Sequence, residues 1–275
     1  MIMNTIRNTK VYILNLGKLE CDENWMVAMS TVATKDNKNV ATHWVEIPVY
    51  AVLIDHPEGK ILFDLGCHPQ ASEGHWCPEL VNIFPFTFAE HQRLENQLKL
   101  VNIRPEDITT VILSHMHLDH IGNIDLFKHA EVYVSRKEFE YAKTLVHSNQ
   151  DPKSHGAYIK SEVVAPVKCY HLLNEDTEIF PGIEFIALPG HTAGSAGLIV
   201  HLEKEGVLIF PMDAIYNKTV YGPPARASGL VYDSIAFFKS IERVRSLAKK
   251  YQAQVMFSHD MAVFENMKKA PDYYC

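Results

Sequence analysis

A short segment of the sequence holds four side chains of types that bind metal ions, namely His115, His117, Asp119 and His120. His115 and His117 are two positions apart, so on an extended segment their imidazoles point to the same side. Asp119 and His120 follow where the chain must turn into its next element. Four such groups can divide between two neighbouring ions. Mixed imidazole and carboxylate ligands suit Zn(II) best, with Fe(II), Mn(II) and Co(II) as alternatives.

Three further residues of these types each follow an apolar segment that is typical of a strand. They are His191, Asp213 and His259. Alone, each would be explained as a capping residue or a buried polar residue with a hydrogen-bond partner. Together they indicate that several strands end at one edge of a sheet, beside the histidine cluster. Sites in layered α/β proteins are built from loops at such edges.

Apolar and β-branched runs predict the strands that would carry these residues. We expect strands over 49–54, 60–64, 108–113, 131–135, 183–188, 197–202, 207–210 and 255–258. A Pro/Gly turn at 55–59 would join the first two strands as a hairpin. Helical periodicity predicts helices over 89–101, 137–145 and 233–250. Strands and helices interleave without a linker or repeat, which favours a single α/β domain over residues 1–275, with layered sheets and helices outside.

The overall composition excludes several classes of partner. The chain has 26 Lys and Arg against 33 Asp and Glu, and this net charge of -7 does not attract nucleic acid or an anionic membrane. We therefore expect a small, neutral or weakly charged substrate. The five cysteines lack C-x-x-C spacing, which indicates reduced thiols. No apolar leader segment follows Arg7, and no uncharged run reaches the ~18 residues of a membrane span, so the predicted location is the cytoplasm.

The order of the ligand-type residues resembles the metallo-β-lactamase superfamily. The pattern is His115-x-His117-x-Asp119-His120, followed at long intervals by His191, Asp213 and His259. The resemblance implies an αβ/βα four-layer sandwich with two metals at one edge of its sheets. One metal would take His115, His117 and His191, the other would take Asp119, His120 and His259, and Asp213 would bridge them. The pair would hold a shared water as hydroxide for attack on a carbonyl or phosphorus.

Within that superfamily, the chain from about Val49 to Tyr274 is similar to the N-acyl-homoserine lactonases. The similar segments are the hairpin, residues 188–192, residues 257–260 and the tail at 270–274. The most specific is Tyr216, because these lactonases carry a tyrosine three residues after the bridging aspartate and direct its hydroxyl at the lactone carbonyl. The resemblance implies that Tyr216 stabilises the oxyanion and that Asp119 passes a proton to the leaving alkoxide. It implies a dinuclear zinc lactonase that opens N-acyl-homoserine lactones or related lactones, an activity called quorum quenching.

Other residues bear on the support of the metals and on substrate preference. Asp64-Leu65-Gly66 matches the superfamily's D-x-G, whose carboxylate accepts a hydrogen bond from a metal-binding histidine. Aromatic and methionine side chains are candidates for the wall of an acyl-chain slot: Trp25, Met26, Met29, Phe84, Phe86 and Phe88. Leu118 stands where the lactonases often have an aromatic residue, and 121–123 differ from the Ala-Gly-Gly of close relatives. These differences affect substrate preference rather than the ligands.

Several related activities remain as alternatives. Glyoxalase II, a thioester hydrolase, shares the ligand set but normally adds a C-terminal helical domain, for which the residues after His259 are too few. A mononuclear iron sulfur dioxygenase on the same fold shares the motif. Class B β-lactamases usually lack the histidine that His120 provides, and nucleases need a basic groove. The predicted partner is a small-molecule lactone, and the chain would act as a monomer or homodimer.

Overall fold

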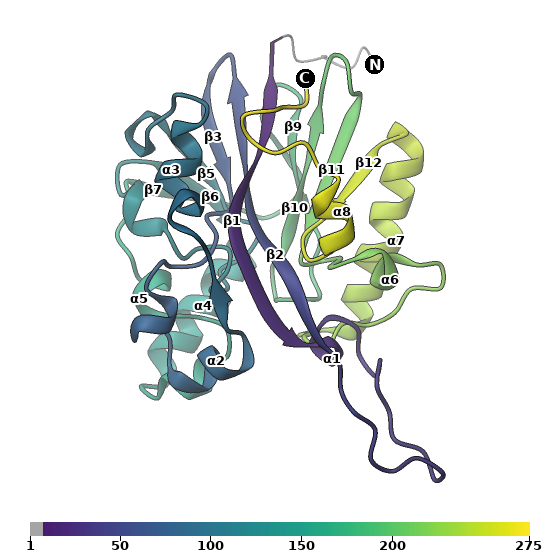
Figure 1. Ribbon diagram of the computed structural model, residues 1–275. Coiled ribbons are helices and arrows are strands. Elements are labelled where there is room, and N and C mark those ends of the chain that lie inside the picture. Colours follow the sequence, from purple (N-terminus) through teal and green to yellow (C-terminus); the bar gives the residue numbers. More distant parts are fainter. Residues whose placement is uncertain (1–7) are drawn as a thin grey trace.

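The computed structural model describes residues 8–275, in which strands form two sheets. The first sheet has seven strands in the order β4 (Phe86–Thr87), β1 (Lys10–Asp22), β2 (Trp44–His56), β3 (Gly59–Phe63), β5 (Thr110–Ile112), β6 (Glu131–Ser135) and β7 (Cys169–Leu173). The second has five strands in the order β12 (Gln254–Phe257), β11 (Val207–Met212), β10 (Ala196–His201), β9 (Ile183–Ala187) and β8 (Thr177–Phe180). The two sheets lie face to face (Figure 1).

The side-chain alternation of the strands explains why both faces of the first sheet are covered. In the β2–β3 hairpin, Ile54 and Phe63 belong to a core cluster shared with strands of the second sheet, whereas Leu53 and Leu62 belong to the cluster on the outer side. Successive strand residues point to opposite faces, so each strand contributes to both clusters. A strand with both faces buried requires layers on both sides, which is the sandwich that the sequence predicted.

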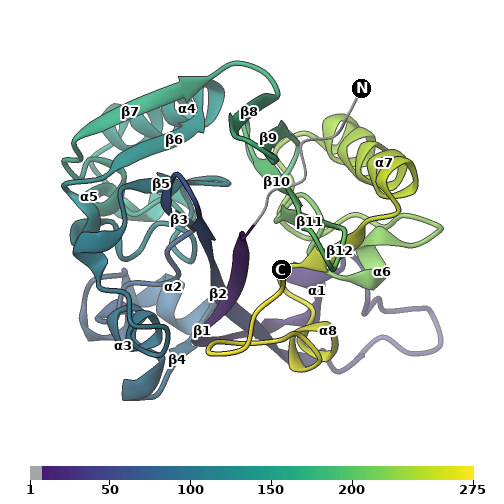
Figure 2. The same cartoon turned by 90° about the horizontal axis from the view of Figure 1, so that it is seen from above.

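Helices supply the two outer layers (Figure 2). Outside the first sheet lie α2 (Pro78–Ile83), α3 (Leu94–Lys99), α4 (Arg136–Ser148) and α5 (Lys160–Val163). Outside the second lies α7 (Ser234–Tyr251), whose buried side chains include Phe237, Ile241 and Val244 at helical spacing. Three short helices complete the set: α1 (Glu23–Met26), α6 (Lys218–Tyr221) and α8 (Met261–Glu265). The arrangement confirms the metallo-β-lactamase αβ/βα sandwich.

Strand direction brings the five strands that precede the site residues to one edge of the sandwich with their carboxyl ends. In the first sheet β3, β5, β6 and β7 are parallel. In the second, β9 and β11 both run antiparallel to β10, and β12 is parallel to β11. The ligand-type residues follow β5, β9, β11 and β12, as the sequence predicted, and Asp64 follows β3. The backbone of Asp64 has a φ of +58°, which turns the chain sharply away from the sheet.

The helix predicted over 89–101 is wrong in part. The chain instead forms a short 3-10 helix at Glu90–Gln92, an extended residue at Arg93 (ψ 141°) and then α3. Hydrogen bonds to a bulge in β1 hold this break. The Asn15 amide donates to the Gln97 side chain, and the Gln92 side chain donates to the Asn15 side chain. These contacts span roughly eighty positions of sequence, so helical periodicity could not reveal them.

Strand boundaries differ from the expected ones where burial hides alternation. The β2–β3 hairpin is confirmed, but β2 runs from Trp44 to His56, longer than expected, and the strand expected at 108–113 is only β5. No strand was predicted for β1, β7 or β8. β1 is buried along most of its length on both faces, so its sequence does not alternate between polar and apolar residues. It nevertheless pairs with β2 over most of its length.

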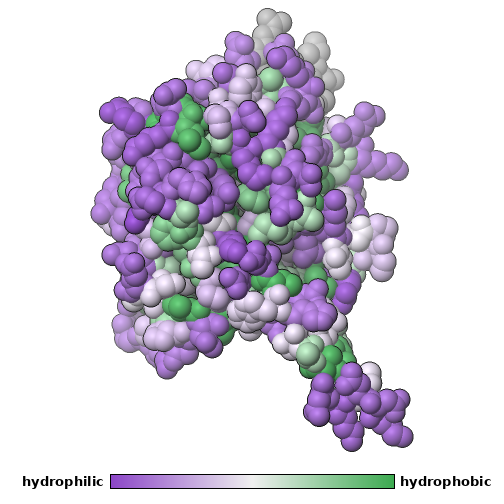
Figure 3. Space-filling view, in the orientation of Figure 1, coloured by the Kyte–Doolittle hydropathy of each residue, from purple (hydrophilic) through white to green (hydrophobic). Residues whose placement is uncertain are grey.

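A segment without regular structure projects from the body between α1 and β2, at residues 27–43 (Figure 1). Figure 3 shows apolar side chains near its base and a hydrophilic tip. None of the helices within 8–275 is long and apolar enough to cross a membrane. All five cysteines are unpaired, as expected. The expected lack of a leader concerns residues 1–7, which lie outside the described part, and the single-domain interpretation stays a prediction.

Candidate metal centre

The seven predicted ligands meet at the shared edge, although they come from four separate loops. The structure separates them into two groups whose ligand atoms lie within 4.8 Å of one another. The first group is His115, His117 and His191; the second is Asp119, His120, Asp213 and His259. Five of them are buried, whereas His117 and Asp119 are partly exposed, the Asp119 side chain to 11%. Both sheets contribute to each group.

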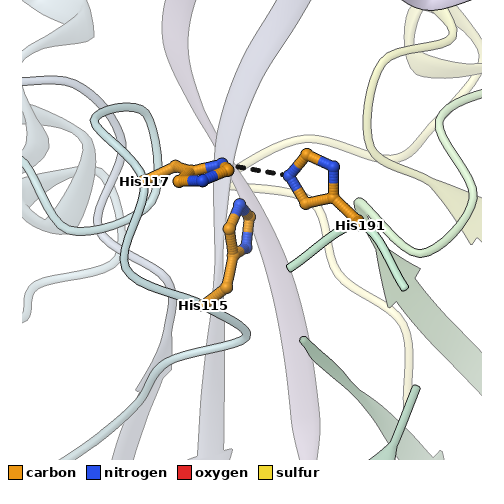
Figure 4. Close-up of side chains that lie close together, drawn as sticks. All are labelled: His115, His117 and His191. Carbon is orange, nitrogen blue, oxygen red and sulfur yellow. Dashed lines mark hydrogen bonds between the residues drawn. The ribbon is translucent and has the colours of Figure 1, made fainter. Parts of the chain in front are cut away.

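The first group consists of three imidazoles around a common point (Figure 4). His117 Nδ1 and His191 Nε2 are 3.0 Å apart, and the His115 ring stands edge-on to both other rings. The rings come from two loops, one after β5 and one between β9 and β10. Ring nitrogens that converge at this distance match the ligand set of a tetrahedral zinc site that keeps one position open.

The second group combines carboxylate and imidazole ligands. Asp119 Oδ2 lies 3.5 Å from both His120 Nε2 and His259 Nε2. His259 enters from the end of β12, so this group also joins the two sheets. Asp119 is partly exposed, and it lines the cleft above the site.

Asp213 lies between the two groups and faces both. Its Oδ2 is 3.7 Å from His115 Nε2 and 3.5 Å from His191 Nε2, in the first group. Its Oδ1 is 3.3 Å from His120 Nε2 and 3.2 Å from His259 Nε2, in the second. One carboxylate oxygen directed at each group is the geometry of a bridging ligand.

Hydrogen bonds on the outer nitrogens determine which nitrogen each imidazole presents to the centre. His191 Nδ1 lies 3.1 Å from the Leu230 carbonyl, and His259 Nδ1 lies 3.2 Å from the Pro48 carbonyl. A carbonyl can only accept, so Nδ1 carries a proton in both residues, and Nε2 is the nitrogen that faces the centre. Metal-binding histidines are oriented by such outer partners.

Asp64 performs the same function for the histidine motif. Its Oδ2 lies 2.7 Å from His120 Nδ1 and accepts a hydrogen bond from that nitrogen. It also accepts from the Ser114 hydroxyl at 2.7 Å, while Oδ1 accepts from the Ser114 amide. The Ser114 hydroxyl lies 2.9 Å from His115 Nδ1, so the carboxylate orients His115 indirectly. The D-x-G aspartate therefore supports one histidine from each group.

Some buried polar atoms of these residues have no hydrogen-bond partner, which indicates an arrangement suited to a metal ion. His115 Nε2, His120 Nε2 and Asp213 Oδ1 are buried and have no hydrogen-bond partner within residues 8–275. A buried polar atom without a partner costs ~1–3 kcal/mol, so several directed at one point require explanation. Divalent ions coordinated by imidazole and carboxylate would satisfy all three atoms.

The protonation states of these side chains also favour a metal centre. Burial holds the pKa of His115 and His117 well below the usual range, which keeps both imidazoles neutral and able to bind a metal. Burial opposes ionisation of Asp213, but the His259 and His120 imidazoles outweigh it and hold the pKa of that carboxyl well below its usual range. The bridging position therefore carries a carboxylate.

Tyr216, predicted to face the substrate, lies at the wall of the centre. Its hydroxyl is 3.1 Å from His191 Nδ1, and its ring packs edge-on against His191 and His259. Burial raises the pKa of the phenol well above its usual value, so the hydroxyl stays protonated. The side chain also lines the cleft that leads to the metal ligands.

Beyond the ligands, the wall of that cleft is apolar. The prediction of the aromatic and methionine side chains that line it was only partly correct. Met26 and Phe84 line it, and Trp25 packs on Phe84 with ring centroids 5.6 Å apart. Phe86 and Phe88 line a different hollow, and Met29 is 73% exposed on the projecting segment. Residues that the sequence analysis missed complete the wall: Leu19, Ile47, Ala157 and Leu230. They come from β1, β2 and two loops, and nothing in their local sequence marks them.

Comparison with known proteins identifies the family. The sequence model of the metallo-beta-lactamase superfamily matches residues 44–220. N-acyl homoserine lactonase AiiB of Rhizobium rhizogenes is 32% identical over 276 aligned residues, covering 96% of this chain and 98% of the relative. The chain belongs to the N-acyl homoserine lactonase family of the metallo-β-lactamase superfamily. Another lactonase, from Bacillus cereus, is 28% identical with the same coverage.

Solved structures agree with this family assignment. An N-acyl homoserine lactone hydrolase with the product N-hexanoyl-L-homoserine bound at its catalytic metal center superposes with a TM-score of 0.82 and 25% identity. The superposition covers 98% of this chain and 100% of the chain of that hydrolase. The dizinc quorum-quenching lactonase AidC, at a TM-score of 0.65 and 19% identity, shares the fold. This chain therefore shares its fold with both lactonases.

Proposed function

We propose that this protein is a metal-dependent hydrolase that opens the lactone ring of N-acyl homoserine lactones. The observation that carries the proposal is the nearly full-length similarity to curated N-acyl homoserine lactonases. The two groups of converging ligands at the base of an apolar cleft support it. The apolar wall suits an acyl chain, and the substrate is uncharged, as the composition led us to expect.

The proposed cofactor is a pair of zinc ions. The first would be held by His115, His117 and His191, the second by Asp119, His120 and His259, with Asp213 between them. When bound, the pair supplies Lewis acidity and a nucleophilic hydroxide near neutral pH. The protein's own contribution is to fix the ligands through Asp64 and the carbonyls of Leu230 and Pro48, and to exclude bulk water by burial.

Tyr216 and Asp119 are the proposed catalytic side chains. The His191 Nδ1–H would be shared between the Leu230 carbonyl and the Tyr216 oxygen, each 3.1 Å away, which leaves the Tyr216 hydroxyl hydrogen free. That hydrogen would be donated to the lactone carbonyl oxygen as negative charge develops there. Asp119, the partly exposed carboxylate at the cleft, would take up the proton released as water adds to the carbonyl and pass it to the ring oxygen as the ring opens.

A substrate panel tests the activity. Proton release by the zinc-loaded protein would be measured with acyl homoserine lactones, aliphatic lactones, S-lactoylglutathione and a cephalosporin. We expect turnover of the acyl homoserine lactones and slower or no turnover of the thioester and the β-lactam. Turnover of S-lactoylglutathione alone would instead establish a glyoxalase II activity.

Replacing Tyr216 tests its role. Tyr216→Phe removes the hydroxyl but keeps the ring that packs on His191 and His259. We expect kcat for lactones to fall roughly 100- to 1,000-fold, as for the loss of one oxyanion donor, with the metal content unchanged. Equal turnover by the variant and the wild-type protein would refute the role.

A further inference from the structure

Glu138 is a charged residue buried next to the first ligand group. It is the third residue of α4 and has no exposed surface. It does not line the cleft and is not a member of either ligand group. A buried carboxylate is costly unless it is fully hydrogen-bonded, so its partners indicate its purpose.

Four donors saturate this carboxylate, two at each oxygen. Oε1 accepts from the Met116 amide at 3.1 Å and from the Tyr158 hydroxyl at 2.9 Å. Oε2 accepts from the Thr192 hydroxyl at 2.6 Å and from the Gly194 amide at 3.2 Å. All four partners donate, which is the pattern that an ionised carboxylate accepts.

The donors flank every ligand of the first group. Met116 lies between His115 and His117 in the chain. Tyr158 packs its ring edge-on against the His117 ring, with centroids 4.5 Å apart. Thr192 directly follows His191. The two loops that supply the three histidines of Figure 4 are thus joined through one side chain.

The backbone is shaped for this contact. A side chain at Gly194 would place a Cβ 2.3 Å from the Glu138 backbone nitrogen, so only glycine allows the His191 loop to approach the start of α4. The second group has different supports. His120 donates to Asp64, and His259 to the Pro48 carbonyl. Glu138 contacts neither of these residues nor their supports.

We propose that Glu138 is a positioning residue for the His115, His117 and His191 half of the metal centre, and that it controls the affinity of that half alone. The inference rests on the proposed two-metal function. By joining the two loops, the carboxylate holds the three ring nitrogens at a common point before the ion arrives. Loss of such outer-shell partners weakens metal affinity on the order of 10- to 100-fold.

Glu138→Gln tests this inference with little change in shape. The amide NH₂ cannot accept, so two of the four donors lose their acceptor while the side-chain volume is kept. Zinc affinity would be measured by competition with a chromophoric chelator, together with metal content after dialysis. We expect one of two zinc ions to bind on the order of 10- to 100-fold more weakly and the other to bind as in the wild-type protein.

A matched control separates positioning from charge. Glu162→Gln also removes a buried glutamate, which pairs with His75 at 2.8 Å and makes no hydrogen bond to either ligand loop. Zinc affinities are compared at pH 8, above the pKa of about 7 of Glu162, so that the control also removes a negative charge. If Glu138 acts only through its negative charge or through general stability, both variants will lower the affinity alike, and the inference fails. Selective loss in Glu138→Gln supports it.

A second variant covers the case in which Glu138→Gln does not fold. Thr192→Val removes a single donor to Oε2 and should weaken the same ion by a smaller factor, with kcat lowered more than KM is raised. Unchanged affinity in a folded Glu138→Gln, or equal weakening of both ions, would overturn the inference. Wild-type protein that binds fewer than two zinc ions would overturn the proposed two-metal centre, and the inference with it.

Discussion

At the scale of single residues, the site is organised by carboxylates that differ in their surroundings. Asp213 faces both ligand groups, Asp64 and Glu138 accept hydrogen bonds behind them, and Asp119 reaches the cleft. Their roles follow from what each oxygen faces rather than from residue type. An oxygen directed at imidazole lone pairs fits a metal, whereas one that accepts from several N–H and O–H groups fixes the backbone.

Glu162 differs from these carboxylates because it lies outside the metal centre. Burial raises the pKa of this carboxyl to about 7, although the His75 imidazole opposes the rise. The folded protein therefore holds a proton that the unfolded chain releases near pH 4.5, and the free energy of unfolding decreases as pH rises from 4.5 to 7.

We predict that the free energy of unfolding of Glu162→Gln increases relative to that of the wild-type protein as pH rises. The amide cannot ionise, so the variant escapes this loss, which is at most about 3 kcal/mol. Urea unfolding of both proteins at pH 5 and pH 8 measures the difference. A stability difference that is the same at the two pH values would show that Glu162 titrates normally.

At the scale of elements, the ligand loops depend on the helices against which they pack. The β9–β10 loop, which carries His191, lies on the start of α7. The Gly190 carbonyl accepts from the amides of Tyr232 and Asp233, and the Pro189 carbonyl accepts from the Ser240 hydroxyl. Gly190 has a φ of +137°, which side chains disfavour. The position of His191 thus depends on a close approach of loop and helix.

We predict that Gly190→Ala displaces this loop. A Cβ there would lie 2.3 Å from the backbone of Phe237, so α7 or the loop must shift. The cost should be about 1–3 kcal/mol, with weaker binding of the ion held by His191. Chemical unfolding and zinc competition measure the two effects.

Gly206→Ala is the control for Gly190→Ala. Gly206 also has a positive φ, +75°, but open space where the Cβ would be. It should therefore lose stability through backbone strain and keep its zinc affinity. Equal zinc affinity in the two variants would show that the contact with α7 does not position His191.

At the scale of the whole molecule, the metal centre joins the two sheets. His115, His117, Asp119 and His120 follow a strand of the first sheet, whereas His191, Asp213 and His259 follow strands of the second. Bound ions would therefore add a further link between halves of the sandwich that meet through apolar packing and through hydrogen bonds such as that of His259 to the Pro48 carbonyl. A ligand that binds only the folded state stabilises it by mass action.

We predict that removal of the metals lowers the melting temperature substantially. Zinc at a thousand times its dissociation constant contributes ~4 kcal/mol, and each ~1 kcal/mol shifts Tm by ~2–4 °C in a chain near this size. Scanning calorimetry with and without a chelator should differ by roughly 10 °C. Asp213→Asn, which loses the bridging carboxylate, should show a much smaller difference. A chelator effect of equal size in that variant would count against the bridge.

Local sequence patterns predicted the chemistry of the site and most of the strands that carry it. Ligand type, order and placement after apolar strands were all visible, because strand patterning and ligand chemistry are local properties. All seven predicted ligands lie together, and the D-x-G aspartate binds a motif histidine as expected. The resemblance carried by Tyr216 also agrees with the family to which the chain belongs.

The positions of these groups depend on contacts that form only in the folded protein. The break at Arg93, the cleft wall from Leu19 and Ile47, and the carboxylate of Glu138 depend on contacts between residues far apart in the chain. Glu138 lies in an ordinary helix start, and nothing around it predicts that Met116 and Thr192 will meet there. Local sequence encodes which groups can bind or accept, whereas folding selects which of them face one another.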